Sequence, residues 1–272
     1  MNLDDIKKHW TDLAVQFQQD INATTKTVSI KKLEIKALYD AIVKTGLQKG
    51  EVLEVGCGNG LNCFALAEQL PALKFTGTDY VPEMVQAALS ELSKPANSKF
   101  SNLSFYEGDI LRLDENTNLA KTYDVVFTDR CVINLNSSQL QEQAVTNLIK
   151  KVKKGGYLVI LENIKQNHDR QNNAREVVGL PRRAQPPYNL FIDESELTAW
   201  VSKEMALKEV NDFGSLHDLL LYVLVPAING GTVDYNHPIV HAATDFLLKN
   251  NDTNGNSFGS LGQNRLYLFH KG

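Results

Sequence analysis

The chain of 272 residues is 43% apolar, which is enough for a sizeable core and fits one large α/β domain or a domain with a cap. With 28 lysines and arginines against 32 aspartates and glutamates, the formal net charge of −4 gives no overall attraction for nucleic acid or for an anionic membrane. Three cysteines without a Cys-x-x-Cys pair argue against a disulfide framework or a zinc site, and with an acidic start that lacks a signal sequence they predict a soluble, cytoplasmic protein.

Two amphipathic helices are predicted at the start of the chain. Apolar residues recur at helical spacing in residues 4–20 and again in residues 30–43, with a polar link between them. We assign residues 1–48 to an N-terminal helical cap.

Beyond residue 48, short apolar runs alternate with helical segments. Strands are predicted at residues 51–55, 74–78, 103–106, 123–128 and 157–161. Helices are predicted at residues 61–70 and 82–93, and a third helix should run from a cap at Ser137 or Ser138 to about Val152. The pair Gly155-Gly156 should break the chain before the fifth strand. Strands that alternate with helices in this way predict a parallel, doubly wound sheet.

The pattern after the fifth strand is less regular. Residues 163–188 predict a long loop, with or without a short helix. A capping box at residues 193–196 should open a helix through about Trp200, and strands are predicted at residues 206–210 and 265–270.

A long insertion separates these last two strands. Its roughly fifty residues far exceed the usual connection of about 4–6 residues, so we assign residues 215–262 to an inserted cap and residues 49–214 with 263–272 to the core. The apolar stretch 219–228 within the insertion is interrupted by Pro226 and is shorter than the about 20 residues that span a bilayer. It therefore favours a buried helix.

A glycine-rich segment, residues 54–60, joins the first buried strand to the helix that follows. A strand that turns sharply into a helix needs residues without Cβ, so that the backbone can bend and approach a ligand closely. The pattern here is G-x-G-x-G. The dinucleotide fingerprint is G-x-G-x-x-G, and Leu61 occupies the position of its last glycine. The segment therefore predicts a nucleoside site and disfavours an NAD-dependent oxidoreductase.

Acidic residues follow the next two strands. Asp79 lies about 20 residues after Gly60, the spacing at which a carboxylate accepts hydrogen bonds from ribose hydroxyls. Asp109 ends the third strand and could accept the amino group of an adenine. Because ligands of open α/β sheets bind at the carboxyl ends of the strands, we expect Glu54, Asp79 and Asp109 to share one crevice.

From residue 51 to about residue 161 the chain resembles the class I methyltransferases that use S-adenosylmethionine (SAM) and release S-adenosylhomocysteine (SAH). The glycine segment, the two acids and the fourth strand occur in that family's order, and residues 153–156 resemble the turn before its fifth strand, with Lys154 in place of the usual proline. The resemblance implies a Rossmann-like, doubly wound, seven-stranded and mainly parallel α/β sheet, with N-terminal helices and an inserted acceptor-side cap near the C-terminus.

The same resemblance implies SAM as the cofactor. Glu54 would hold the methionine amino group directly or through water, and Tyr80 and Met84 would flank the cofactor. The full set of expected cofactor-binding residues is Glu54, Gly56, Cys57, Gly58, Gly60, Asp79, Tyr80, Met84, Asp109, Ile110, Thr128 and Arg130.

The segment after the fourth strand, residues 130–135, lies where acceptors meet the cofactor. It is neither the Asp/Asn-Pro-Pro-Tyr/Phe motif of nucleic-acid amine methyltransferases nor a Pro-Cys pair, which argues against a nucleic-acid substrate. Its Arg-x-x-Ile-Asn-Leu pattern instead resembles a subgroup that methylates bacterial surface polysaccharides or small metabolites. Later residues that fit this subgroup are Glu162, Asn172, Arg175, the pair Gly179-Leu180 and the pair Tyr188-Asn189.

We therefore predict a SAM-dependent methyltransferase (EC class 2.1.1) whose partner is a small acceptor, methylated on an oxygen of a sugar, a sugar nucleotide or another anionic metabolite. The predicted acceptor-binding residues are Asn134, Arg175, Tyr188 and Asn189, and the predicted catalytic residues are Arg130, Tyr188 and His217. No nucleic-acid or membrane partner is expected, and a homodimer is compatible with the sequence.

Several alternatives stay open. Arg130 could bind the cofactor carboxylate or an anionic acceptor through a forked contact, or pair with an acid such as Asp129. A basic cluster at Arg175, Arg182 and Arg183 could clamp a phosphate or carboxylate, or lie in a solvated loop.

A metal site and a clear general base are both missing from the pattern. His237 and His241 are four residues apart, but Pro238 lies between them and no strong third ligand is evident, so no metal is predicted. His217 opens an apolar helix and could accept a proton near its ordinary pKa of about 6.5. Because no base is unambiguous, the alternative function is a catalytically silent SAM-binding or partner-binding module.

Overall fold

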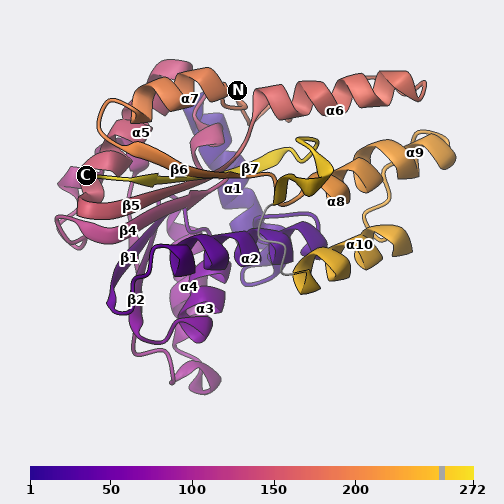
Figure 1. The fold of residues 1–272 in the computed structure, drawn as a ribbon. Coiled ribbons are helices and arrows are strands. Elements are labelled where there is room, and N and C mark those ends of the chain that lie inside the picture. Colours follow the sequence, from indigo (N-terminus) through magenta and orange to yellow (C-terminus); the bar gives the residue numbers. More distant parts are fainter. Residues whose placement is uncertain (251–254) are drawn as a thin grey trace.

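The computed structural model, which describes residues 1–250 and 255–272, is organised around a seven-stranded sheet (Figure 1). The strands are β1 (Gly50–Val55), β2 (Leu73–Asp79), β3 (Leu103–Glu107), β4 (Tyr123–Asp129), β5 (Val152–Asn163), β6 (Ala206–Asn211) and β7 (Asn264–His270). Their order is β3-β2-β1-β4-β5-β7-β6. Strands β1 to β5 pair in parallel, and β7 pairs antiparallel with β5 and β6. The predicted Rossmann-like, mainly parallel sheet is confirmed.

Helices cover both faces of this sheet. They are α1 (Leu3–Phe17), α2 (Val28–Lys44), α3 (Leu61–Gln69), α4 (Pro82–Leu92), α5 (Ser138–Lys151), α6 (Lys165–Val177), α7 (Glu194–Val201), α8 (Ser215–Leu219), α9 (Val225–Ile228) and α10 (Pro238–Lys249). Helices α5 and α7 lie on one face, and α2, α3 and α4 lie on the other (Figure 1). Helices α6, α8, α9 and α10 extend beyond the carboxyl ends of the parallel strands.

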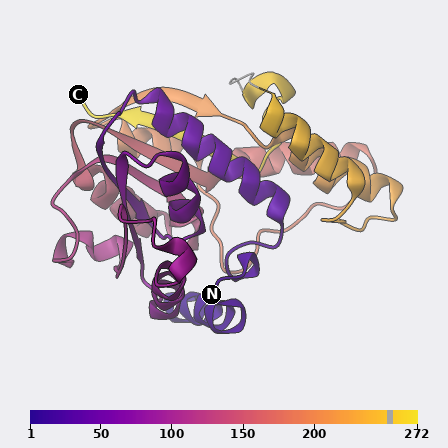
Figure 2. The same cartoon turned by 90° about the horizontal axis from the view of Figure 1, so that it is seen from below.

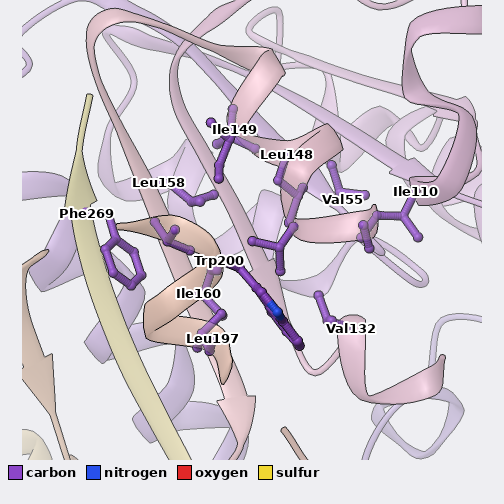
Figure 3. Close-up of a cluster of buried hydrophobic side chains, with 14 of the residues drawn as sticks. Val55, Ile110, Val132, Leu148, Ile149, Leu158, Ile160, Leu197, Trp200 and Phe269 are labelled. Carbon is purple, nitrogen blue, oxygen red and sulfur yellow. The ribbon is translucent and has the colours of Figure 1, made fainter. Parts of the chain in front are cut away.

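Two apolar clusters sandwich the central strands. On one face, Leu148 of α5 and Trp200 of α7 pack in the cluster that contains Leu158 of β5 (Figure 3). On the other face, Leu38 of α2 packs in the cluster that contains Phe127 of β4. Strands buried on both faces consist of nearly continuous apolar runs, which explains why the sequence predicts them so well.

Helix α6 lies within residues 163–188, for which the sequence predicts a long loop with or without a short helix, and at 13 residues it is longer than that prediction. Its buried side chains are all polar: Asn167, His168, Gln171, Asn172 and Arg175. These residues follow helical spacing, but an apolar pattern is absent, so the periodicity of hydrophobic residues could not reveal the helix. The polar stripe makes specific contacts instead, since the Asn167 amide donates to Asp212 Oδ1 and to the Gly262 carbonyl at 2.8 Å each.

Strand β5 also differs from the prediction, because it begins at Val152 and continues through the two glycines. Gly155 adopts a left-handed φ of +77°, and a Cβ on Gly156 would lie 2.7 Å from the Asp124 carbonyl oxygen. The pairing of β4 with β5 shifts register between Tyr123 and Val125. The glycines therefore allow an irregularity within the strand rather than a break.

The insertion between β6 and β7 is mostly helical. It contains α8, a π-helical turn (Leu220–Leu224), α9 and α10, and α10 packs on α2. Figure 2 shows α10 (gold) alongside α2, with α1 (indigo) apart from both at the lower edge of the view. Residues 251–254 of the predicted cap lie outside the described residues. In the described part of the chain, no helix has the length and apolar character needed to cross a membrane.

The sheet core predicts a clear difference between two leucines in strands. Leu158 in β5 is fully buried, whereas Leu207 in the edge strand β6 is 45% exposed. Replacement Leu158→Ala should lower the free energy of unfolding by about 2–5 kcal/mol, because it removes buried methyl groups and leaves a cavity. The control Leu207→Ala should change it by about 0.5 kcal/mol or less. Urea denaturation followed by circular dichroism measures both, and equal losses would contradict this description of the core.

Candidate functional site

A cavity of about 570 Å³ opens at the carboxyl ends of β1, β2 and β4. The strand order reverses between β1 and β4, and this switch point is where open α/β sheets bind their ligands. The cavity wall continues over α1, α2, the segment 183–191 and the insertion. The predicted cofactor residues that line it are Gly56, Cys57, Gly58, Asp79, Tyr80, Met84, Asp109, Ile110 and Arg130.

The turn between β1 and α3 has the backbone that its glycines predict. Gly56 and Gly60 both adopt a left-handed φ, of +78° and +85°. A Cβ on Gly56 would lie 2.4 Å from the Cys131 sulfur, so a side chain there would collide with the segment after β4. Gly60 is not part of the cavity wall, and a Cβ there would lie 2.8 Å from the Phe105 ring. Gly60 therefore shapes the turn without facing a ligand.

Asp79 ties this turn to the end of β2. Its Oδ2 accepts a hydrogen bond from the Gly58 amide at 2.8 Å, and its Oδ1 accepts one from the Val81 amide at 2.9 Å. Burial raises the pKa of Asp79 although these amides oppose the shift. The carboxylate is thus fixed in the cavity wall at the position expected for a ribose contact.

Asp109 occupies the corresponding place after β3. Its Oδ1 accepts from the Leu111 amide at 2.9 Å and caps a 3₁₀ helix (Ile110–Glu115). Both Asp109 and Ile110 line the cavity. The structure therefore brings the two predicted acids into one crevice.

Glu54 is buried behind the cavity wall rather than in it. Its carboxylate accepts hydrogen bonds from the Asn62 amide at 2.8 Å and from the Cys63 thiol at 2.9 Å. Burial raises the pKa of Glu54 to about 8. Asn62 lines the cavity, and its hydrogen bond connects Glu54 to the cavity wall.

A buried charge network forms the part of the wall between α2 and β4. Lys31 lies 2.7 Å from Asp129 and 2.7 Å from Glu34, and Arg130 Nε lies 2.9 Å from Glu34. Burial opposes ionisation, but the attraction of Asp129 and Glu34 keeps the pKa of Lys31 above its ordinary value. The attraction of Lys31 and Arg130 likewise lowers the pKa of Asp129 against the effect of burial. Lys31, Asp129 and Arg130 therefore face the cavity as charged groups.

The sequence reasoning missed Lys31 and Asn62. Lys31 belongs to a helix whose apolar spacing was the only signal noted, and a lysine in such a helix ordinarily faces solvent. Asn62 lies in the first turn of α3, directly after the glycine segment, and this position was the signal that could have identified it.

Glu162 fixes the segment that follows β4. Its Oε1 accepts from the amides of Cys131 and Val132 at 2.9 and 2.8 Å, and from the Thr128 hydroxyl at 3.2 Å. Burial raises the pKa of Glu162 to about 7, against the effect of the backbone amides. Thr128, which was expected to contact the cofactor, lies outside the cavity wall and instead bonds to Glu162. Arg130 begins this segment with a left-handed φ of +54°.

Three of the predicted acceptor residues gather beneath α1. Asn134, Tyr188 and Asn189 line the cavity. The Tyr188 ring stacks on His9 with 4.1 Å between ring centroids, and the Trp10 indole donates to Asn134 Oδ1 at 3.2 Å. Helix α1 therefore covers this part of the cavity, a role that its amphipathic pattern alone did not reveal.

Two of the predicted acceptor-binding and catalytic residues do not reach the cavity. Arg175 is buried and donates to the carbonyls of Pro181 and Tyr222. His217 is fully buried, with its ring nitrogens 2.9 Å from the Ser29 hydroxyl and 2.8 Å from Asp218 Oδ1. Neither residue lines the cavity, so both side chains support the insertion instead of meeting an acceptor. In the described part of the chain, no histidine lines the cavity and no group of three metal-ligating side chains forms.

Comparison with protein families gives one match that covers more than half of the chain. The model of a methyltransferase domain matches residues 48–207. This range includes the glycine turn, both acids, Glu162 and the segment 183–191.

Two curated relatives match shorter stretches. The biotin biosynthesis bifunctional protein BioCD of Bordetella avium is 28% identical over 159 residues, which are 56% of this chain and 30% of that protein. The demethylmenaquinone methyltransferase of Deinococcus radiodurans is 30% identical over 111 residues, which are 41% of this chain and 42% of that protein. The chain therefore matches less than half the length of either relative.

Solved structures share the fold across most of the chain. The N-methyltransferase NodS of Bradyrhizobium japonicum in complex with SAH has a TM-score of 0.54 at 12% identity, covering 96% of this chain and 98% of its own. The magnesium protoporphyrin IX methyltransferase of Synechocystis with bound SAM has a TM-score of 0.52 at 12% identity, covering 89% of this chain and 80% of its own.

The buried Glu54 predicts a pH dependence of stability. An unfolded glutamate releases its proton near pH 4.5, whereas folded Glu54 keeps it up to about pH 8. The folded state thus binds more protons in this window, and the free energy of unfolding should fall as pH rises through it. Glu54→Gln removes the titration, so the variant should lose less stability between pH 5 and pH 8, by up to about 1.4 kcal/mol per pH unit.

Urea denaturation at several pH values measures this difference. The matched control is Glu68→Gln, which changes a glutamate of helix α3 whose side chain is 60% exposed. A wild-type slope equal to that of Glu54→Gln would contradict the assignment of a raised pKa to Glu54.

Proposed function

Because the chain belongs to the SAM-dependent methyltransferase family, we propose that it transfers the methyl group of SAM to a small acceptor. The acceptor atom is an oxygen of a sugar, a sugar nucleotide or another anionic metabolite. The observation that carries this proposal is one continuous cavity, which extends from Gly58 and Asp79 to Tyr188 and to Tyr222 of the insertion. In this proposal the cofactor occupies one end of the cavity and the acceptor the other.

The residues at one end of the cavity fit SAM. Gly58 lines the cavity with a left-handed φ of +53°, and a Cβ there would lie 2.7 Å from a methyl group of Thr24, so a side chain would collide with the cavity wall. Asp79 would accept hydrogen bonds from the ribose and Asp109 from the adenine amino group. The methionine part carries an ammonium and a carboxylate, for which Asp129 and Lys31 offer opposite charges.

The other end would hold the acceptor. When bound, SAM supplies a sulfonium whose methyl group is already electrophilic, so the protein must mainly align the acceptor and exclude water. Trp10 and Tyr188 close the cavity on the side of α1. In this proposal Tyr188, Asn134 and Asn189 orient the acceptor, and Arg130 contributes positive charge beside the segment that follows β4.

A second candidate is a catalytically silent SAM-binding or partner-binding module. Two observations favour it: the described cavity wall contains no histidine, and Asp129 is already paired with Lys31. Turnover of any acceptor would exclude it.

We further infer a cytoplasmic location, in which the three free thiols would remain reduced. The homodimer that the sequence allows stays a prediction.

The direct test is release of SAH from purified protein and SAM across sugar nucleotides, phosphorylated sugars, small acids and amines. Acceptor-dependent release would support the proposal and indicate the chemistry of the acceptor. SAM binding without release across the panel would favour the silent module. Tight NADH binding without affinity for SAM would overturn both.

Asp79 provides a second test. Asp79→Ala should weaken SAM binding by about tenfold or more, because it removes charged hydrogen bonds to the ribose worth roughly 1.5–3 kcal/mol. Calorimetric titration measures the dissociation constant, and circular dichroism checks that the variant is folded.

The control Asp124→Ala removes another strand-end aspartate that accepts a backbone amide, from Glu51 at 2.8 Å, but near the amino end of β4 and outside the cavity wall. It should bind SAM like the wild type. Unchanged affinity in folded Asp79→Ala would contradict the proposed ribose contact.

A further inference from the structure

The structure separates the three arginines of the basic cluster into different environments. Arg182 is exposed and pairs with Asp169 and Glu176 at 3.0 Å each. Arg175 is buried and holds backbone carbonyls. Arg183 alone of the three lines the cavity. The three arginines therefore do not act as one cluster, and only Arg183 presents its positive charge to the cavity.

Helix α6 holds Arg183 in a fixed position. The Asn172 side chain accepts from the Arg183 amide at 2.8 Å and donates to its carbonyl at 3.0 Å. Gln171 Oε1 accepts from Arg183 Nη1 at 2.9 Å. Gln171 and Asn172 are themselves buried. The polar stripe of α6 therefore positions Arg183.

The guanidinium of Arg183 also stacks on an aromatic ring of the insertion. Its central carbon lies 3.6 Å from the centroid of the Tyr222 ring. Stacking and the bond to Gln171 reduce the conformational entropy that Arg183 would lose on binding a ligand. An arginine held in this way is ready to bind a planar or tetrahedral anion through two N–H groups.

In the described part of the chain, no ion pair neutralises the charge of Arg183. Lys31 and Arg130, which line the same cavity, are paired with Glu34 and Asp129. By contrast, no carboxylate within residues 1–250 and 255–272 forms an ion pair with Arg183. Asp218 lies in the same wall, but it already accepts from His217 at 2.8 Å and from the Gln263 amide at 2.7 Å.

Solvent screens this charge only partly. Burial together with the charge of Arg183 lowers the pKa of His168, and burial with the same charge lowers the pKa of Arg175. Arg183 itself is half-buried, and an anion is attracted more strongly in such a place than in bulk water.

We propose that Arg183, stacked on Tyr222, forms an anion subsite that recognises a carboxylate or phosphate group of the acceptor. This inference rests on the proposed function, because it assigns the acceptor end of the same cavity. Tyr235 and Phe191 line the wall nearby and would contact the uncharged part of the acceptor. Arg183 acts as a specificity-determining residue, since it holds the acceptor by a group other than the methylated atom.

The test uses matched pairs of charged and neutral probes on the SAH-saturated protein. One pair is glucose 6-phosphate and glucose, and the other is benzoate and benzamide. Ligand-observed NMR titration measures binding to the wild type, Arg183→Gln, Arg183→Lys and Arg182→Gln. Arg182→Gln is the matched control, because it removes the neighbouring arginine that faces solvent.

At least one anionic probe should bind the wild type saturably and more tightly than its neutral partner. Arg183→Gln should weaken that binding by about tenfold or more, since a charge-assisted hydrogen bond is lost. Arg183→Lys should retain part of the affinity, and Arg182→Gln should retain it fully. Preference for glucose 6-phosphate or for benzoate would distinguish a phosphate from a carboxylate as the recognised group.

Three outcomes would overturn the inference: neither anion binds, neither binds better than its neutral partner, or Arg183→Gln binds them as the wild type does. Calorimetric titration of SAH runs in parallel on every variant. Normal SAH binding with failed anion binding would contradict the subsite alone, whereas loss of SAH binding in the wild type would contradict the proposed function itself.

Discussion

The buried ion pair between Lys31 and Asp129 connects the parts of the protein that form the cavity. It joins α2 to the end of β4 at a distance of 2.7 Å, and both side chains are almost fully buried. Removing one partner from such a pair costs roughly 3–5 kcal/mol, because the other charge is left uncompensated. The pair is also connected to α3, because the Asn62 side chain donates a hydrogen bond to Asp129 at 2.9 Å. It is connected to β7 through Glu34, the second partner of Lys31, which accepts a hydrogen bond from Asn264 at 2.6 Å. The cavity floor thus contains paired positive and negative side chains, and hydrogen bonds from α3 and β7 hold it in place.

The sequence predicts most of the sheet because its central strands are buried on both faces and therefore contain short, nearly continuous apolar runs. The glycine turn and the acids after β2 and β3 are also predictable, because their roles depend on backbone conformation and strand position more than on distant contacts. Helix α6 was not predictable from apolar periodicity, since its buried face is polar. The burial of Lys31 could not be predicted either, because it depends on two acids. Asp129 is 98 residues away in the chain, and Glu34 is three residues away in the same helix.

The roles of the proposed catalytic and acceptor residues were likewise not predictable from sequence spacing alone. The sequence does not distinguish Arg175 from Arg183, because both are arginines of one basic segment. The packing of α6 against the insertion directs Arg175 toward backbone carbonyls and Arg183 toward the cavity. His217 looked available as a base, but Ser29 and Asp218 occupy its ring nitrogens. Such assignments require knowledge of which polar groups meet across elements, and spacing along the chain does not contain it.

The most direct measurement of the central claim is a crystal structure of the protein with SAH bound. The account predicts that the ribose lies against Asp79, that the adenine lies beside Asp109 and Ile110, and that the amino-acid end lies near Lys31, Asn62 and Asp129. It predicts as well that the region between Tyr188 and Arg183 stays open for an acceptor. SAH bound outside this cavity, or inside it with the ribose away from Asp79, would contradict the account.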